Sequence, residues 1–399
     1  MPIRVRQHLI DPETCIRCNS CELSCPKDAI SHDTHNYVVD PDLCEFCMDC
    51  VTPCPTGAID NWFHVNAPVE QFLWDELPPR APETDEIPAD ALEPEASALL
   101  LDAHARAGGR MRPPATAAKP RINLFGRSNP AIARVTGNLR ITAPGATADT
   151  RHIILDFGTT PFPVLEGQTI GIIPPGLDAE GRPHAIRLYS VASPRDGERQ
   201  NTNNLALTVK RIVVSDADGE PFLGIASNYL CDLPIGASVS ITGPYGASFL
   251  MPDDPEADIL MICTGTGAAP FRGFIGRRIR TTHHGSGRMH LFFGARSPRE
   301  LPYFGPLQKV APRLLHQELV YSRIPGHPRE YVQDRLRKRA ASIARLLKRD
   351  TTHIYICGRR GLEDGVNQAL TDVCRQYQQD WPELRGHMLE QGRFHAETY

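Results

Sequence analysis

The sequence lacks long apolar runs, which excludes the commonest kind of membrane protein. No stretch reaches the roughly 18 consecutive apolar residues that a membrane-spanning helix requires. Arg4 and Arg6 are followed by no apolar run, so we expect no signal peptide and a cytoplasmic location. The chain also lacks a basic excess, because 43 Lys and Arg residues face 47 Asp and Glu residues, and we expect no nucleic-acid partner.

Residue patterns that activate oxygen are missing as well. The sequence has no two-histidine, one-carboxylate cluster and no Glu-x-x-His pair of the kind that holds mononuclear or di-iron centres. Cysteine is sparse after residue 54, where the chain contains Cys231, Cys263, Cys357 and Cys374. A lone cysteine is by default a small buried side chain, and we interpret Cys231, Cys263 and Cys374 in this way.

The other eight of the 12 cysteines stand in two runs that share the spacing Cys-x2-Cys-x2-Cys-x3-Cys-Pro. Cysteines in a cytoplasmic chain indicate metal or redox chemistry rather than disulfides. In two-cluster ferredoxins the fourth cysteine of each run ligates the other cluster. We therefore assign one [4Fe–4S] cluster to Cys15, Cys18, Cys21 and Cys54, and the second to Cys44, Cys47, Cys50 and Cys25.

A pair of structural zinc sites is the alternative, because paired cysteines also bind zinc. Zinc modules usually separate their two ligand pairs by about 12 residues or more, whereas each foursome here is tight and ends in Pro26 or Pro55. Residues 8–64 resemble a bacterial-type two-cluster ferredoxin, and we predict a ferredoxin domain over residues 1–65. This segment is acidic, with 4 Lys and Arg residues against 10 Asp and Glu residues.

The composition changes after this segment. Residues 66–122 are rich in proline, alanine and acidic residues, and we interpret them as a linker in which residues 96–107 form one short helix. Residues 131–252 contain six short β-type runs between Gly and Pro turns, which predicts an antiparallel barrel in a domain of residues 123–252.

The remaining residues alternate strand and helix. This pattern predicts a doubly wound parallel α/β domain over residues 253–399, so the expected fold class is multidomain α+β. A basic segment, residues 334–349, is interpreted as a solvated helix face, with docking of the acidic N-terminal segment as the alternative.

A glycine-rich turn, CTGTGAAPFR at residues 263–272, lies where the first strand of the parallel sheet passes into a helix. Gly265 and Gly267 would let backbone N–H groups approach a ligand, and Pro270 suits the first helical turn. A pyrophosphate would meet free amides and the positive end of the helix there. An ordinary strand-to-helix turn is an equally common source of the pattern.

Six motifs follow one another in order: RLYSVAS (187–193), GIASNYLCDLPIG (224–236), CTGTGAAPFR (263–272), YSR (321–323), YICG (355–358) and ETY (397–399). From about Asn123 to the last residue, the chain resembles the plant-type ferredoxin–NADP reductase family. This resemblance implies that FAD and NADPH bind to Arg187, Leu188, Tyr189, Ser190, Thr208, Lys210, Ile225, Ala226, Ser227, Thr264, Gly265, Thr266, Gly267, Ala295, Arg296, Ser322, Arg323, Arg329, Tyr331, Gly358, Glu397 and Tyr399.

The resemblance also implies roles for several of these residues. Arg187 would pair with the FAD pyrophosphate through its planar guanidinium, and Tyr189 would stack on the flavin. Ile225, Ala226 and Ser227 would offer backbone amides and a hydroxyl to the FAD phosphates. The implied catalytic residues are Ser190 at flavin N5, Cys357 beside the nicotinamide, Glu397 bordering the same pocket and Tyr399 covering the flavin.

The choice of nicotinamide cofactor depends on the region after YSR. Ser322 and Arg323 stand where the family binds the 2′-phosphate of NADP, and Arg329 and Tyr331 match a second phosphate-binding pair. Two solvated arginines on a loop are the alternative. The chain departs from the family at Val213 and Val214, where a tyrosine often stacks on the FAD adenine, and at Arg359, which replaces an apolar residue.

Together the parts predict an electron path from NADPH to FAD and then to the two clusters, because flavin exchanges electrons both in pairs and singly. The absence of an oxygen-activating motif places the final acceptor in another protein. The domain arrangement resembles the reductase components of two-component oxygenases, which implies a separate di-iron oxygenase as partner. Reverse flow that generates NADPH, and a non-catalytic electron-carrier subunit, are the alternatives.

Overall fold

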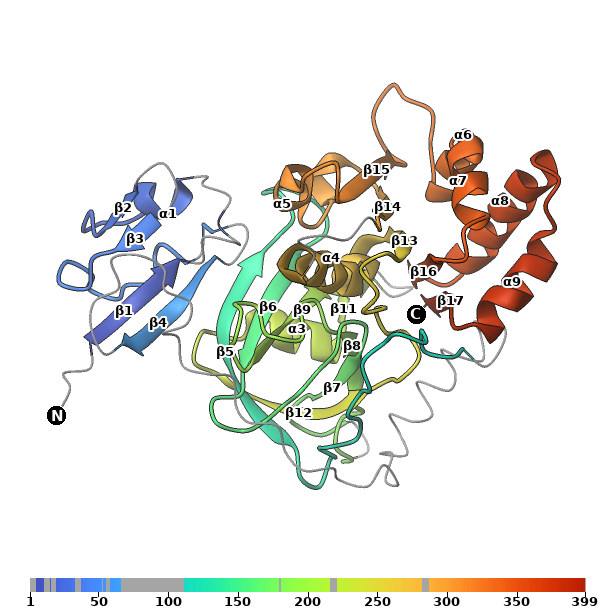
Figure 1. Ribbon diagram of the computed structural model, residues 1–399. Coiled ribbons are helices and arrows are strands. Elements are labelled where there is room, and N and C mark those ends of the chain that lie inside the picture. Colours follow the sequence, from blue (N-terminus) through green and yellow to red (C-terminus); the bar gives the residue numbers. More distant parts are fainter. Residues whose placement is uncertain are drawn as a thin grey trace.

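The computed structural model describes residues 5–10, 15, 19–32, 37–51, 53–54, 58–65, 111–178, 181–215, 221–281 and 287–398. The helix predicted at residues 96–107, Cys18 and Tyr399 lie outside these ranges. Figure 1 shows an N-terminal body beside a barrel, with an α/β body on the far side of the barrel. Within the described residues, no helix is long and apolar enough to cross a membrane.

The N-terminal body consists of short elements around a small core. Its elements are β1 (Val5–Ile10), α1 (Ser20–Leu23), β2 (Ile30–His32), β3 (Tyr37–Val39) and β4 (Ile59–Val65), with β1 antiparallel to β4 and β2 antiparallel to β3. Cys21, Cys50 and Cys54 are themselves members of its buried core. So small a core stabilises a domain only weakly, which fits a domain whose interior is completed by bound clusters.

The middle body is a six-stranded antiparallel barrel, as predicted. Its strands are β5 (Ala131–Arg140), β6 (Thr150–Asp156), β7 (Thr169–Ile173), β8 (Arg187–Ser190), β9 (Asn204–Lys210) and β12 (Ser238–Tyr245). The strand order is β8-β7-β12-β5-β6-β9, and a bridge between Val191 and Leu207 joins the two edges. Helix α3 (Ile225–Asp232) packs on the barrel core, and β10 (Val213–Ser215) pairs with β11 (Pro221–Leu223).

The C-terminal body is a five-stranded parallel sheet in the order β15-β14-β13-β16-β17, covered by helices on both faces. The strands are β13 (Asp258–Thr264), β14 (Met289–Ala295), β15 (Leu315–Tyr321), β16 (Thr352–Gly358) and β17 (Phe394–Thr398). The helices are α4 (Ala269–Thr281), α5 (Phe304–Lys309), α6 (Val332–Lys338), α7 (Ala340–Leu347), α8 (Leu362–Gln376) and α9 (Trp381–Glu390).

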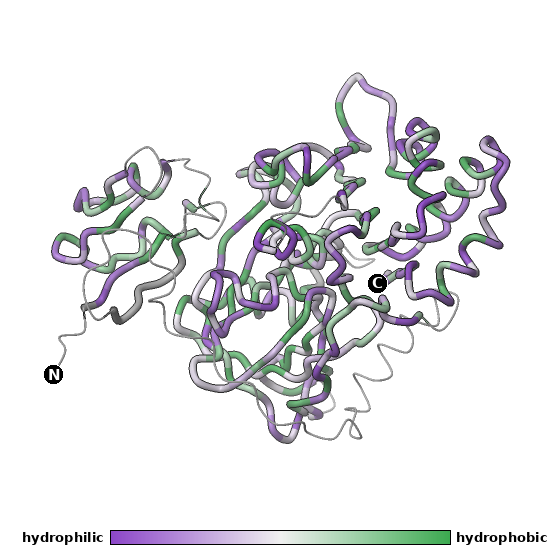
Figure 2. The backbone as a smooth tube through the Cα atoms, in the orientation of Figure 1, coloured by the Kyte–Doolittle hydropathy of each residue, from purple (hydrophilic) through white to green (hydrophobic). Residues whose placement is uncertain are grey.

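Alternating residues of the sheet fill two separate cores. Leu260 and Ile262 pack with α6 to α9, whereas Met261 and Cys263 pack with α4 and α5. This two-sided burial explains the continuous apolar runs of the strands, and it confirms the doubly wound prediction. Figure 2 shows hydrophobic residues in the strands of both sheets and many hydrophilic residues along α8 and α9.

Three details differ from the sequence prediction. The basic segment 334–349 is not one continuous helix, because the helix is interrupted at Arg339 between α6 and α7. The strand–helix pattern predicts a helix over residues 303–315 and a strand over residues 318–322, whereas α5 ends at Lys309 and β15 begins at Leu315. The residues Phe394–Thr398 form β17, a fifth strand that hydrophobic alternation did not reveal because only five residues carry it.

Candidate functional site

The glycine-rich turn lies at the carboxyl end of β13, which runs into a short 3-10 helix (Gly265–Ala268) and then α4. Gly265 has a positive φ of 56°, which favours glycine. A Cβ added at Gly267 would lie 2.2 Å from the carbonyl oxygen of Cys357, so this position is small because the ends of β13 and β16 meet closely. The turn therefore carries an internal packing constraint that the sequence analysis did not foresee.

Cys357 and Glu397 face each other across β16 and β17. They are register partners in this parallel pair. Burial raises the pKa of the Cys357 thiol well above its usual value, and the neighbouring Glu397 carboxylate raises it further. Burial likewise raises the pKa of Glu397 to about 8. Both groups therefore hold their protons at neutral pH.

The strand β8 carries the residues predicted to meet the flavin. Arg187 is exposed, whereas Tyr189 and Ser190 are half-buried, and burial raises the pKa of the Tyr189 hydroxyl. The end of β8 is fixed against α4, because Ala192 packs on Ala269 and the Arg272 Nη1 donates to the Ala192 carbonyl at 2.9 Å. The flavin strand and the glycine turn are thus parts of one packed unit.

Helix α3 presents its first turn beside an exposed aliphatic surface. The Ser227 hydroxyl donates to the Gly224 carbonyl at 3.1 Å and accepts from the Ile212 N–H at 3.2 Å. The backbone N–H groups of the first helical turn have no intrahelical acceptors, which suits a phosphate. Ile212, Val213 and Leu223 are 41%, 54% and 52% exposed. These aliphatic side chains form an exposed surface in the region where the family often has a tyrosine that stacks on the adenine.

The residues predicted to read the 2′-phosphate follow β14 and β15. The Ser322 N–H donates to the Ala295 carbonyl at 3.1 Å, and the Arg323 N–H donates to the Arg296 carbonyl at 2.8 Å. These bonds hold the two strand ends together. Arg329 and Tyr331 are exposed at the start of α6.

Among the described residues, some basic side chains at this edge of the sheet form ion pairs with carboxylates, and others do not. Arg335 pairs with Glu318 and Glu330, and Lys338 pairs with Glu330. In the part of the chain that the structure describes, no carboxylate pairs with Arg323 or Arg329. Two uncompensated guanidinium groups therefore remain available at this edge, which suits a phosphate dianion.

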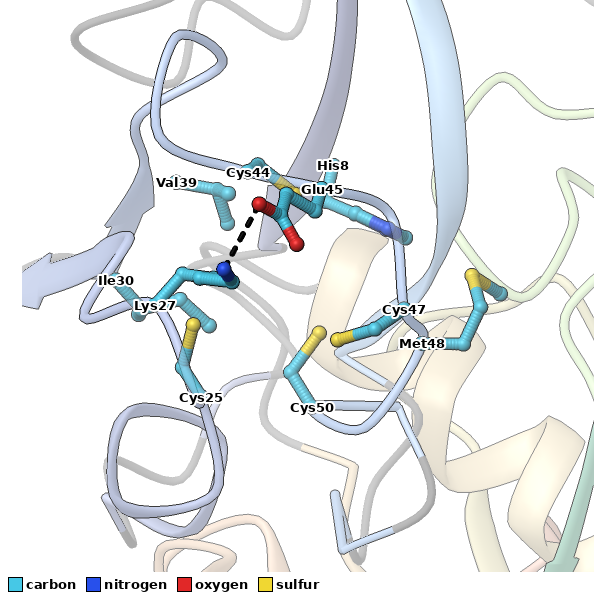
Figure 3. Close-up of a pocket in the computed structure, with 10 residues that line it drawn as sticks. All are labelled: His8, Cys25, Lys27, Ile30, Val39, Cys44, Glu45, Cys47, Met48 and Cys50. Atoms are coloured by element: carbon cyan, nitrogen blue, oxygen red, sulfur yellow. Dashed lines mark ion pairs between the residues drawn. The ribbon is translucent and has the colours of Figure 1, made fainter.

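The N-terminal body brings four predicted cluster ligands together. Cys25 from the first run lines one pocket with Cys44, Cys47 and Cys50 from the second run (Figure 3). Among the described residues, no three His, Cys, Asp or Glu side chains are grouped as ligands of a single metal ion. Four thiols around one pocket are the donor set that a cubane requires. The other predicted set is described in part: Cys15 packs on the core that contains Cys21 and Cys54.

Comparisons with known proteins agree with these features. A 4Fe-4S dicluster domain family matches residues 14–58, and an oxidoreductase NAD-binding domain family matches residues 261–368. Over 289 residues the chain is 39% identical to a ferredoxin–NADP reductase of Thermosynechococcus vestitus, a match that covers 70% of this chain and 75% of the relative. The chain belongs to the ferredoxin–NADP reductase family.

Further relatives support this membership. The chloroplastic ferredoxin–NADP reductase of Spinacia oleracea is 34% identical over 288 residues, covering 70% of this chain and 78% of that protein. The solved ferredoxin–NADP+ reductase of Plasmodium falciparum shares the fold, with a TM-score of 0.56 and 23% identity over 69% of this chain and 99% of that one. As a member of the ferredoxin–NADP reductase family, the chain is an NADP-dependent oxidoreductase.

The structure of this ferredoxin–NADP reductase homologue also contains a buried polar network that the sequence analysis missed. The Tyr303 hydroxyl lies 2.6 Å from the Thr208 hydroxyl and 2.9 Å from His152 Nδ1. His152 Nε2 lies 3.1 Å from Glu198, which also pairs with Arg272. These residues come from distant parts of the sequence and form no motif. Thr208, predicted to bind cofactor, thus contacts Tyr303 in the structure.

Proposed function

We propose that this chain is an NADPH-dependent flavin and iron–sulfur reductase of the cytoplasm, which passes electrons from NADPH through FAD and two [4Fe–4S] clusters to a separate protein. The observation that carries the proposal is the fusion of a dicluster domain to a ferredoxin–NADP reductase module in one chain. Its proposed domains are residues 1–65, a linker of residues 66–122, an FAD domain of residues 123–252 and an NADP domain of residues 253–399.

The barrel is proposed to hold FAD. When bound, FAD accepts electrons in pairs and releases them singly. The exposed Arg187 is available for its pyrophosphate, and the first turn of α3 supplies amide donors. Ile212, Val213 and Leu223 offer an aliphatic contact for the adenine in place of an aromatic ring. Thr208 and Lys210 stay proposed contacts from the adjoining strand β9.

The NADP domain is proposed to bind its dinucleotide along the carboxyl ends of β13 to β16. The glycine turn would hold the pyrophosphate, and Ser322, Arg323, Arg329 and Tyr331 would bind the 2′-phosphate. The proposal is supported by the uncompensated charges of Arg323 and Arg329. An acidic residue at the same edge would instead favour NADH.

The nicotinamide position is proposed to lie at the ends of β16 and β17. The Cys357 thiol is small and stays protonated, so it offers the nicotinamide an uncharged surface. The Glu397 carboxyl keeps its proton up to about pH 8 and can donate a hydrogen bond there. Ser190 at the end of β8 is proposed to donate a hydrogen bond from the opposite side, and Tyr399, outside the described residues, to cover the flavin ring.

The eight cysteines of the N-terminal domain are proposed to hold two clusters in crossed sets. Cys25, Cys44, Cys47 and Cys50, which line one pocket, are one set, and the other is Cys15, Cys18, Cys21 and Cys54. The zinc alternative predicts no absorbance of iron–sulfur type in the visible range.

The final acceptor is proposed to be a di-iron oxygenase. The order of domains resembles the reductase component of benzoyl-CoA 2,3-epoxidase, so the proposed partner is the oxygenase that epoxidises benzoyl-CoA. This proposal depends on whole-chain resemblance alone. Its direct support would be NADPH-dependent epoxidation of benzoyl-CoA when the two purified proteins are combined.

Reverse flow remains a second candidate because the family relatives are named ferredoxin–NADP reductases. In that case, electrons from an external donor would enter through the clusters and form NADPH. Cluster potentials measured against the NADP couple distinguish the two directions. A non-catalytic carrier would instead lack a flavin spectrum.

An anaerobic titration tests the proposed function. We expect NADPH to bleach first the flavin and then the iron–sulfur absorbance, and NADH to do so only at much higher concentration. Arg323→Ala should weaken apparent NADPH binding by about ten- to a hundredfold, because one charge-assisted hydrogen bond contributes roughly 1.5–3 kcal/mol, while leaving NADH unaffected. Equal response to both nucleotides would contradict the NADP assignment, and unbleached clusters would contradict the electron path.

A further inference from the structure

The loop between β8 and β9, residues 194–203, is fixed on one side by helix α4. Arg280 donates to the Gly197 and Glu198 carbonyls at 2.8 and 2.7 Å and to the Asp196 carboxylate at 2.8 Å. Gly197 has a φ of 98°, and an added Cβ would lie 2.4 Å from the Thr202 carbonyl oxygen. The loop therefore has one closely defined backbone conformation.

Glu198 points from this loop into the protein. Its carboxylate is buried between Arg272 of α4 and His152 of β6. These two partners outweigh the effect of burial and hold the pKa of Glu198 well below its usual range. A buried charge with two partners anchors the loop to both the barrel and the NADP domain.

Arg199, the next residue, points the opposite way into the N-terminal domain. Its Nη2 donates to the Leu9 carbonyl of β1 and, at 3.3 Å, to the Ala58 carbonyl just before β4. The side chain is 0% exposed, although it projects from the barrel, so the N-terminal domain contributes to its burial. The Thr202 hydroxyl donates to the Arg199 carbonyl at 2.7 Å, which holds the backbone behind it.

The contact joins parts that are far apart in the chain. Leu9 precedes the first cysteine run and Ala58 follows the second, so one guanidinium bridges both ends of the cluster-binding domain. Strand β4 also lies beside β5 of the barrel, as Figure 1 shows. Arginine suits this position because its planar group donates several hydrogen bonds in fixed directions.

We propose that loop 194–203 is an internal docking element, in which Arg199 holds the cluster-binding domain in one orientation against the barrel for electron transfer between them. Electron transfer requires the two carriers to approach closely, so a fixed orientation removes a search step from every turnover. The inference rests on the proposed function for its kinetic consequence, but the docking itself is measurable without any substrate. Arg199 is a positioning residue.

Full-length Arg199→Ala and Arg199→Lys test the docking. Arg375→Ala is the matched control, because Arg375 is exposed on α8, on the far side of the molecule. Hydrogen exchange and small-angle scattering, both without NADPH, should show about tenfold faster exchange in residues 8–10 and 58–60 and a larger radius of gyration in Arg199→Ala. The exchange rate and radius of gyration of Arg199→Lys should lie between those of Arg199→Ala and the wild type. Lysine keeps a hydrogen-bond donor but lacks the planar guanidinium that donates in several fixed directions.

Stopped-flow kinetics then separate docking from chemistry. NADPH should reduce the flavin of Arg199→Ala within about twofold of the wild-type rate, while cluster reduction slows by about tenfold or more. If Arg199→Ala loses iron, Gly197→Ala provides the second variant, because it displaces the loop without altering any residue of the N-terminal domain. Unchanged exchange, scattering and cluster reduction in a variant with full iron content would overturn the proposal.

The wild-type protein distinguishes the two levels of inference. If NADPH reduces the wild-type flavin but never the clusters, the proposed function fails. If wild-type clusters are reduced and the Arg199 variants behave like Arg375→Ala in every measurement, only the docking role fails.

Discussion

At the scale of single residues, Glu397 couples the stability of the NADP domain to pH. Burial raises the pKa of this carboxyl from 4.5 to about 8, so the folded protein keeps a proton that the unfolded chain loses above about pH 4.5. The resulting stabilisation of the protonated form is complete below about pH 4.5 and is lost progressively as the pH rises from there to about 8. Ionised Glu397 then costs free energy because its charge is partly removed from water.

Glu397→Gln should therefore stabilise the protein at high pH. Glutamine copies the protonated carboxyl, so at pH 9 we expect the variant to exceed the wild type by on the order of several kcal/mol, with little difference near pH 4, where both folded and unfolded wild-type chains keep the proton. Thermal unfolding midpoints at the two pH values measure this. Glu390→Gln, at an exposed position of α9, is the control and should show no such pH-dependent gain.

At the scale of elements, the close contact between the ends of β13 and β16 limits which residues can replace Gly267 in the glycine-rich turn. We expect Gly267→Ala to destabilise the protein by about 1–3 kcal/mol, because the added methyl group would overlap the Cys357 carbonyl. Gly386→Ala is the matched control: it lies inside α9 with no atom near an added Cβ and should stabilise by about 0.5–1 kcal/mol. Thermal unfolding measures both, and equal effects of the two substitutions would refute the packing argument.

Elements also explain what could be read from the sequence. The cysteine spacing, the six barrel strands and the turn at Gly265 are local patterns, so their positions followed from the order of residues. His152, Glu198 and Tyr303 are far apart in the sequence and come together only in the folded structure. No local residue spacing predicts their network. Strand β17 was missed because its five residues look like a chain end until they pair with β16.

The fold also decides whether the basic segment, residues 334–349, docks the acidic N-terminal domain. Residues 334–349 lie on the opposite side of the molecule from the N-terminal domain, and Arg335, Arg337 and Arg339 pair with acidic residues of the NADP domain. The segment therefore does not dock the acidic N-terminal domain. Net charge alone could not distinguish partners within the chain from partners outside it.

At the scale of the whole molecule, the N-terminal domain has a core of its own, separate from the three large cores of the reductase part. A truncated protein that begins at Met111 should therefore fold, bind FAD and reduce ferricyanide with NADPH within about twofold of the full-length rate. It should carry no iron and fail to pass electrons from NADPH to the proposed partner protein. Loss of flavin from the truncated protein would show that the two parts fold as one unit.

The path of the chain between the domains has a practical consequence. Met111 lies against β17, where its sulfur accepts from the Ala396 N–H at 3.2 Å, while β4 ends in the N-terminal domain across the barrel (Figure 1). The end of β4 and the position of Met111 thus lie on different sides of the barrel, and the connection between them must be long enough to cover that span while Arg199 remains engaged. Lengthening a tether costs only about 0.6 kcal/mol per doubling, whereas one shorter than the span forces the domains apart. Insertions between β4 and Met111 should consequently be tolerated, whereas deletions that shorten the connection below this span should not.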